Sequence, residues 1–174
     1  MNNILKNSIR FVLFLMIQII ILNEVPPLHR FITPYIYFLF MLWLPFGTNR
    51  ITLTVLGFLL GYSLDVFTNT PGLHAAAACL IGYIRPTLLN LFVAQETSEE
   101  VNKEPSVATM GWGPYIVYAM VITFMHHFYL VLLEWLQFGS FGYFLGKVTA
   151  TTLMSVLLIL LVELITNRRK QNRS

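Results

Sequence analysis

The chain has few of the residues on which soluble proteins and most enzymes rely. Only 11% of its 174 residues are charged, whereas a soluble domain carries about a quarter. Cys79 is the single cysteine, which excludes an intramolecular disulfide and any metal cluster built from several cysteines. The chain therefore lacks both the usual surface charge and the means to cross-link itself.

Short motifs of common catalytic chemistry are also missing. The sequence contains no Gly-x-Ser-x-Gly, no His-Glu-x-x-His, no phosphate-binding loop and no paired set of carboxylates. His126, His127 and Glu134 invite a metal hypothesis, but paired zinc ligands on a helix usually stand at i and i+4, and Glu134 lies about two turns beyond His127. We expect no catalytic residue, no cofactor and no metal site, and therefore no enzyme.

Apolar residues are what the chain has in abundance. They make up 56% of it, and its mean hydropathy is +0.69. They gather into six runs, at about residues 11–22, 35–46, 51–64, 73–94, 115–133 and 148–165. The last three approach the ~20 residues that a helix needs to cross a bilayer. The first three are shorter and need flanking residues or a locally thinner bilayer.

These runs predict an all-α, multi-pass membrane protein. We expect residues 1–174 to form a single integral membrane domain, a compact bundle of about six transmembrane helices with both termini cytoplasmic. In the alternative, the third and fourth runs form a re-entrant hairpin, which leaves four full spans and the same orientation. Six spans is the preferred prediction.

The basic residues support this orientation. The cytoplasmic segments would hold most of them, and the outer segments only Arg30 and Lys147, as the positive-inside rule requires. The cytoplasmic set is Lys6, Arg10, Arg50, Lys103, Arg168, Arg169, Lys170 and Arg173. The net charge of +3 therefore reflects membrane orientation and does not indicate a nucleic-acid partner.

One polar stretch interrupts the apolar pattern, at about residues 95–110. It carries four glutamates against one lysine, and this topology makes it a cytoplasmic loop. Its composition favours a solvated linker. A docking site for a cytoplasmic partner is the alternative interpretation.

The third apolar run carries a stripe of small residues that ends in a carboxylate. Gly57, Gly61 and Asp65 are spaced by four, so they share one face of a helix, and a Gly-x-x-x-Gly pair lets another helix approach closely. On the fourth run Ala75, Ala78 and Gly82 recur at spacings of three and four and form a matching small-residue face, and Arg85 follows at the same spacing. Antiparallel packing about a turn near Asn69 would complete a close helix pair.

That packing would bring Asp65 level with His74, and three roles for Asp65 remain open. It caps the fourth helix or the turn, it faces a partner or a pocket, or it takes part in proton chemistry. The same register predicts Arg85 near Leu53, within reach of lipid phosphate or of Glu163, with which it would form a buried pair.

In combination, several short stretches resemble one family. They are Pro34-Tyr35-Ile36-Tyr37, Leu44-Pro45-Phe46, the Gly57–Gly61 pair, Leu64-Asp65-Val66-Phe67, Gly72-Leu73-His74-Ala75 and Tyr83-Ile84-Arg85-Pro86. Together they are similar to the rod-shape-determining MreD family, in its Bacteroidetes-type form. The resemblance is densest over residues 34–86.

The resemblance implies a subunit of the cell-elongation machinery in the bacterial inner membrane. Members of that family work with MreC, with the MreB cytoskeleton and with the glycosyltransferase and transpeptidase of peptidoglycan synthesis. Their fold is similar to the substrate-binding component of energy-coupling-factor vitamin transporters. The matching positions are Gly57, Gly61, Asp65, Gly72 and Arg85-Pro86.

Three functions then compete, and the missing catalytic motifs argue against one of them, a membrane enzyme. The first is a non-catalytic membrane scaffold that packs against MreC through a small-residue face, with membrane lipid as its surroundings. The second is a small-molecule binding or transport component. That function needs a polar pocket open to the outside, for which the candidates are His29, Arg30, Asp65, His74 and Lys147.

Overall fold

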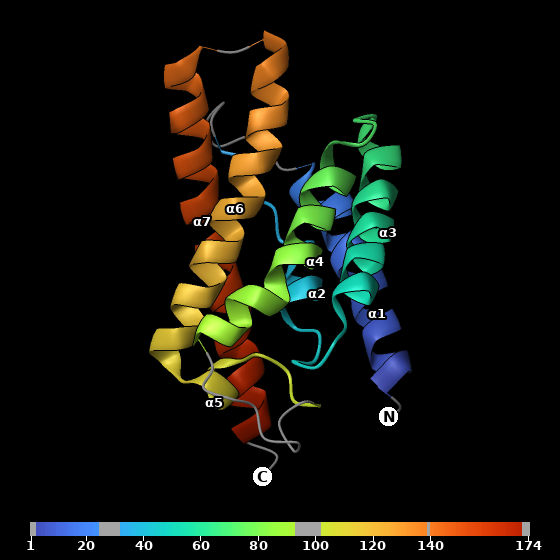
Figure 1. Cartoon of the computed structure of the whole chain (residues 1–174), viewed down its shortest axis with the longest axis vertical. Helices are drawn as coiled ribbons and strands as arrows, with labels where there is room; N and C mark the ends of the chain where they lie inside the picture. Colours follow the sequence, from blue (N-terminus) through green and yellow to red (C-terminus); the bar gives the residue numbers. More distant parts are fainter. Residues whose placement is uncertain (1–2, 25–31, 93–101, 139, 172–174) are drawn as a thin grey trace.

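The chain folds into a bundle of helices, seen in a computed structural model (Figure 1). The structure describes residues 3–24, 32–92, 102–138 and 140–171. Within these ranges the chain forms helices, turns and extended segments, and no strand is present. His29, Arg30 and most of the predicted acidic loop lie outside the described residues. The predicted all-α class is confirmed.

The helices follow one another in a simple order. They are α1 (Asn3–Met16), the π-helical turn η1 (Ile17–Leu22), α2 (Leu39–Leu42), α3 (Arg50–Thr68), α4 (Leu73–Phe92), α5 (Val107–Met110), α6 (Trp112–Phe138) and α7 (Phe141–Gln171). In the described part of the chain, five helices are long and apolar enough to cross a membrane: α1 with η1, α3, α4, α6 and α7. This confirms a multi-pass membrane protein but not the predicted sixth helix.

The missing helix is the predicted second span, residues 35–46. Only α2, four residues long, is α-helical there, and the rest is turn or extended chain. Between Pro34 and Pro45 a helix would be only ~15 Å long, about half the hydrocarbon thickness. An extended chain covers about twice that length. The proline-bracketed run is thus too short to span as a helix.

This broken segment lies inside the bundle, not on its surface. Residues 37–42 are 2% exposed or less. Non-helical backbone at membrane depth is stable only where protein covers it. Figure 1 shows the segment running between α1 and the α6–α7 pair toward the end where α1 begins, and Phe46 N–H donates to the Lys103 carbonyl there (3.0 Å).

At the start of the segment the peptide groups are not paired within a helix, and buried side chains form hydrogen bonds with them. The amide of Gln18 donates to the Pro34 carbonyl (3.1 Å), and its oxygen accepts from Ile36 N–H (2.9 Å). Ser155 Oγ accepts from Tyr35 N–H (3.1 Å). Gln18 and Ser155 are both fully buried. They replace the hydrogen bonds that a helix would have made within itself.

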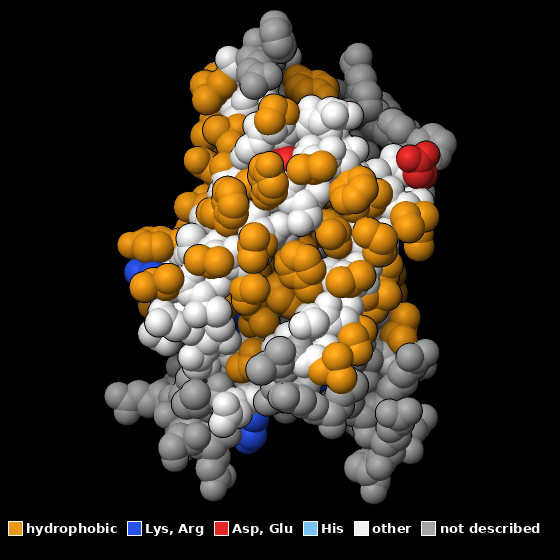
Figure 2. Space-filling model, turned by 90° about the vertical axis from the view of Figure 1, so that its right-hand side faces the viewer, with side chains coloured by type: hydrophobic (Ala, Val, Ile, Leu, Met, Phe, Trp, Pro, Cys, Tyr) orange, Lys and Arg blue, Asp and Glu red, His pale blue; other side chains and the backbone are white. Residues whose placement is uncertain are grey.

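The helices are arranged around α4. It packs against α3 on one side and α6 on the other, and α6 pairs with α7. α1 begins and α7 ends at the same end of the bundle (Figure 1). The broken segment, which is buried among these helices, would add a sixth crossing to the five candidate spans of the described chain. The surface between the ends is largely apolar, as Figure 2 shows for the face that includes α3.

Candidate functional site

Asp65 joins the end of α3 to the beginning of α4. Its Oδ1 accepts from His74 N–H (2.9 Å) and His74 Nδ1 (2.9 Å), and its Oδ2 accepts from Ala75 N–H (3.0 Å). Thr70 Oγ1 donates to the same carboxylate (3.0 Å). These N–H groups belong to the first turn of α4, which has no partner for them within the helix. Asp65 therefore caps α4, and the predicted contact with His74 is confirmed.

The connection between α3 and α4 turns near Asn69, as predicted. Asn69 has φ 55° and Gly72 has φ 85°, both in the left-handed region. A Cβ on Gly72 would meet nothing within 4 Å. Gly72 is therefore needed for its backbone conformation and not for helix packing.

Removing the Asp65 carboxylate should destabilise the fold without touching the apolar core. Asp65→Ala leaves the N–H groups of His74 and Ala75 without their acceptor, and we expect a loss of about 2 kcal/mol in the free energy of unfolding. Unfolding in mixed micelles measures it. Ser63→Ala, which removes a hydroxyl bonded to Leu59 O on the same helix, is the control and should change the free energy by about 0.5 kcal/mol or less. Equal losses in the two variants would contradict the capping role.

The glycine stripe is used for contact within the chain. An added Cβ on Gly57 would lie 2.5 Å from the Ala78 carbonyl oxygen, and one on Gly82 would lie 2.6 Å from that of Leu53. Gly61 is equally tight against the backbone of His74 and Ala75. The predicted antiparallel packing of α3 and α4 is confirmed. The small-residue face of α3, which was predicted to contact MreC, is covered by α4 of the same chain.

The same contacts correct the predicted register. Leu53 faces Gly82 and not Arg85, about one helical turn away from the prediction. In the observed register the first residues of α4 lie against Gly61, about one turn before Asp65, and Asp65 reaches the N–H of His74 through its side chain.

Arg85 is fully buried, and it does not reach Glu163 or the surface. Its guanidinium donates to the Leu42 carbonyl (3.2 Å) and, through a short contact, to that of Leu44. It also donates to Tyr118 OH (3.0 Å). These carbonyls lie at the end of α2, where the helix leaves its last carbonyls unpaired and favours a positive charge. Arg85 therefore holds the C-terminal end of the broken segment through hydrogen bonds to its backbone carbonyls.

Glu163 has other partners than the predicted one. Its carboxylate accepts from Val107 N–H (3.0 Å), at the start of α5, and from Tyr115 OH (3.2 Å). Tyr115 in turn accepts from Trp43 Nε1–H (3.3 Å). The predicted Arg85–Glu163 pair is therefore wrong. Sequence spacing could not reveal the true partners of Arg85, because they are carbonyls and a tyrosine from distant segments.

The two adjacent histidines of α6 also hold the broken segment. His126 Nε2 is hydrogen-bonded to Tyr37 OH (2.7 Å), and its Nδ1 lies 3.1 Å from His127 Nδ1. The ring of Phe38 stacks on His126, with centroids 4.4 Å apart. Glu134 lies elsewhere and pairs with Lys147. In the described ranges no three or more His, Cys, Asp or Glu residues are grouped closely enough to hold a metal.

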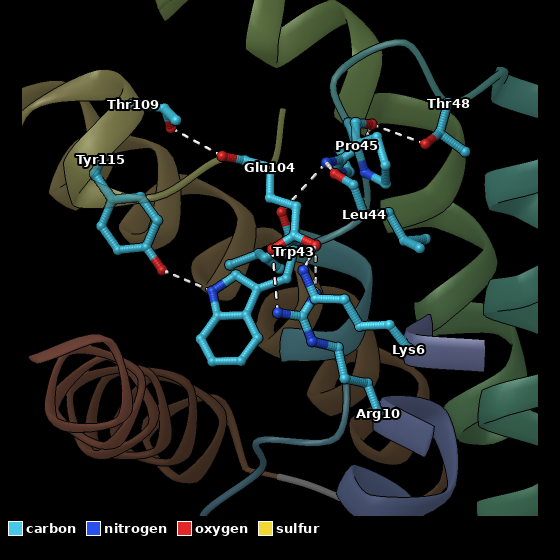
Figure 3. Close-up of polar contacts among 11 residues, drawn as sticks. Lys6, Arg10, Trp43, Leu44, Pro45, Thr48, Glu104, Thr109 and Tyr115 are labelled. Atoms are coloured by element: carbon cyan, nitrogen blue, oxygen red, sulfur yellow. Dashed lines mark hydrogen bonds and ion pairs between the residues drawn. The ribbon is translucent and has the colours of Figure 1, made fainter. Parts of the chain in front are cut away.

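At the end where both termini lie, Glu104 fastens the described part of the acidic loop to α1 (Figure 3). Its carboxylate accepts from Lys6 Nζ (2.6 Å) and from both terminal nitrogens of Arg10 (2.7 and 3.1 Å). Arg10 also lies over the Trp43 ring, 5.2 Å from its centroid. This part of the loop is thus a fixed contact rather than a solvated linker.

The ion pairs make the stability contribution of Glu104 depend on pH. Burial alone would raise the pKa of Glu104, but hydrogen bonds from Arg10 and Lys6 outweigh it and hold the pKa below its ordinary value. The contribution is thus complete above the ordinary pKa of about 4.3 and is lost as pH falls through the lower folded value. We expect Glu104→Gln to lower the free energy of unfolding by about 1 kcal/mol at pH 7. Unfolding of both proteins across an acid titration should show the difference shrinking; a constant difference would contradict it.

A cavity of about 410 Å³ opens at the opposite end of the bundle. It lies between the end of η1, the start of the broken segment, the α3–α4 turn and α6. His74, Tyr35, Thr70 and Glu134 line it, with apolar neighbours such as Phe67. Of the pocket candidates in the described chain, His74 lines the cavity. Asp65 stands behind it, and Lys147 reaches it through Glu134.

Comparison with known proteins gave no match to a family model, to a curated protein or to a solved structure.

Proposed function

We propose that this protein is a non-catalytic scaffold of the MreD type in the bacterial inner membrane. It would join MreC to the peptidoglycan synthases and the MreB cytoskeleton of the cell-elongation complex, and so maintain rod shape. One observation carries the proposal. The residues on which the family resemblance depends contact one another and the buried broken segment, as expected of residues that shape a rigid body.

The contacts form one connected unit over residues 34–86. Gly57 and Gly61 bring α3 against α4, Asp65 caps α4 beside His74, and Arg85 holds the carbonyls at the end of the broken segment. Intramembrane ionisable residues usually mark transport or proton pathways. Here two of them are bound to the chain's own backbone, which favours a structural role.

The outer face of α3 is the surface that such a body offers to a partner. Its apolar side chains recur every three or four residues and are 47–71% exposed, as Figure 2 shows in part. They are Ile51, Val55, Phe58, Tyr62 and Val66. A face of this kind suits lipid or a single apolar helix, such as the membrane anchor of MreC.

The orientation in the membrane is a separate part of the proposal. The basic side chains of Lys6 and Arg10, at the end of the bundle that holds both termini, support a cytoplasmic position for the termini.

Loss of the gene in the source bacterium tests the proposal. The rods should become round, and the unaltered chain expressed from a plasmid should restore them, measured as the ratio of cell length to width. MreC should co-purify with the unaltered chain and with a Gly142→Ala control, because a Cβ at Gly142 meets nothing within 4 Å. Cells that stay rod-shaped without the gene would overturn the scaffold proposal.

The small-molecule binding component remains the alternative, and the cavity at the end opposite the termini is the observation that favours it. Its volume of about 410 Å³ lies within the usual range for ligand pockets, about 300–1,000 Å³. A ligand-binding scan of the purified protein separates the two functions. Accumulation of a bound compound in cells that keep their shape without the gene would favour this alternative.

A further inference from the structure

Arg50, the first residue of α3, holds its guanidinium against two side chains of α4. Its Nη2 donates to Thr87 Oγ1 (2.9 Å), and its Cζ lies over the ring of Tyr83, 4.7 Å from the centroid. Residues 83 and 87 are four apart, so both side chains lie on one face of α4. The guanidinium is thus held between two helices, and its contact with Thr87 is exposed at the surface.

The positive charge of Arg50 has no carboxylate partner among the described residues. A guanidinium carries five N–H donors, and the bond to Thr87 uses one of them. The first turn of α3 contains no acidic residue. Glu24 lines the cavity at the opposite end of the bundle, and the other described carboxylates bind other groups: Asp65, Glu104, Glu134 and Glu163. An anion is therefore the ligand that would satisfy this guanidinium.

The surroundings of Arg50 indicate which kind of anion fits. Arg50 is the first residue of a helix that is apolar enough to cross a membrane, so its guanidinium lies where the hydrocarbon meets the headgroups. α3 begins toward the end of the bundle where both termini lie (Figure 1). The side chains beside Arg50 are apolar and open to the surroundings, with Ile51 71%, Tyr83 56% and Leu91 73% exposed. This surface suits acyl chains, and the guanidinium at its edge suits a phosphate.

We propose that Arg50, positioned by Tyr83 and Thr87, binds the phosphate of an anionic phospholipid whose acyl chains lie against the outer faces of α3 and α4. A planar guanidinium donates two parallel N–H groups to a phosphate, which an ammonium group cannot do. The lipid site does not rest on the scaffold function. Its failure would leave the scaffold proposal standing, and the reverse also holds.

Native mass spectrometry of the full chain in detergent, titrated with phosphatidylglycerol or phosphatidylcholine, tests the proposal. Arg50→Met should weaken phosphatidylglycerol binding by about fivefold or more, the factor that one basic group contributes near an anionic lipid surface. Binding of phosphatidylcholine should not change. Arg50→Lys should keep part of the affinity, because it retains the charge but not the planar fork. Lys147→Met removes the same charge at the opposite end of the bundle and is the matched control, which should bind as the unaltered chain does.

Two further titrations separate the lipid from other anions. Inorganic phosphate has no acyl chains and should not displace phosphatidylglycerol; displacement at equal concentrations would identify a free phosphate as the ligand and overturn the proposal. Glu96, Glu99 and Glu100 lie outside the described residues, and replacing all three by glutamine should leave the effect of Arg50→Met unchanged.

Two other results would also overturn the proposal. One is equal binding of phosphatidylglycerol by the unaltered chain and by Arg50→Met. The other is an effect of Arg50→Met that appears only after the three glutamates are replaced, because Arg50 would then be paired within the chain. Melting followed by circular dichroism verifies that each variant is folded.

Discussion

Replacing Arg85 by methionine should lower the free energy of unfolding by about 3–5 kcal/mol, the largest effect that we expect from any single substitution. The guanidinium is fully buried and is the donor to the Leu44 carbonyl, and it shares the Leu42 carbonyl with Tyr118. A buried carbonyl that loses its donor costs about 1–3 kcal/mol. Shortening of the side chain adds a packing loss.

A matched variant separates this effect from a general loss of positive charge. Arg50 begins α3 near the same end, and its guanidinium bonds to Thr87 and lies over the ring of Tyr83. Arg50→Met should lower the free energy of unfolding by about 1 kcal/mol or less, since the site is exposed. Arg85→Lys should recover part of the loss, because an ammonium reaches fewer carbonyls than a guanidinium fork. Similar losses for Arg85→Met and Arg50→Met in mixed micelles would contradict the role given to Arg85.

Gly61→Ala should separate α3 from α4 and destabilise the bundle by about 3 kcal/mol. A methyl group at Gly61 would lie 2.5 Å from the His74 carbonyl carbon and 2.6 Å from the Ala75 Cα. Both are backbone atoms, which cannot rotate away as a flexible side chain would. Inserting a carbon into a packed interior typically costs 1–3 kcal/mol, and rigid neighbours put this site at the upper end.

The same substitution where space is free provides the control. A Cβ at Gly142, near the start of α7, meets nothing within 4 Å. Gly142→Ala should be neutral or stabilise the protein by up to about 1 kcal/mol, because alanine is the better helix former. If Gly61→Ala and Gly142→Ala had the same unfolding free energy, the close approach of α3 and α4 would be refuted.

Local patterns in the sequence were sufficient to predict the α3–α4 pair. Gly57, Gly61 and Asp65 repeat at the helical period, and the turn at Asn69 fixes the antiparallel direction. The helix pair and the turn depend on residues that are near one another in the chain, which is why spacing predicted them. Spacing left the capping role of Asp65 as one of three alternatives, and it misplaced the register of the pair by about one turn.

The broken segment is held by residues that are far apart in the chain, and sequence spacing could not reveal it. Residues 35–46 are as apolar as a spanning helix, and hydropathy does not distinguish a buried extended chain from a buried helix. The partners that stabilise it are Gln18, Ser155 and Arg85, which come from three other helices. The prolines at 34 and 45 were the available signal, because they bracket a run too short to span as a helix.

The Glu104 contact was missed for a similar reason. The composition of residues 95–110 indicated a solvated loop, and the basic residues of α1 indicated only the orientation of the chain in the membrane. Lys6 and Arg10 instead meet Glu104, almost a hundred residues away in the chain. Composition reports the solvation of a segment as a whole and not the partner of one side chain.

The passage of residues 32–46 through the membrane as a buried, mostly non-helical chain is the central claim, and labelling of two cysteines tests it most directly. In a Cys79→Ala background, Glu24→Cys and Gly47→Cys place exposed thiols just before and just after the segment. A membrane-impermeant maleimide applied to intact cells should label position 24, and position 47 should react only after the membrane is opened. Labelling of both positions from the same side would contradict the crossing and, with it, the six-pass arrangement.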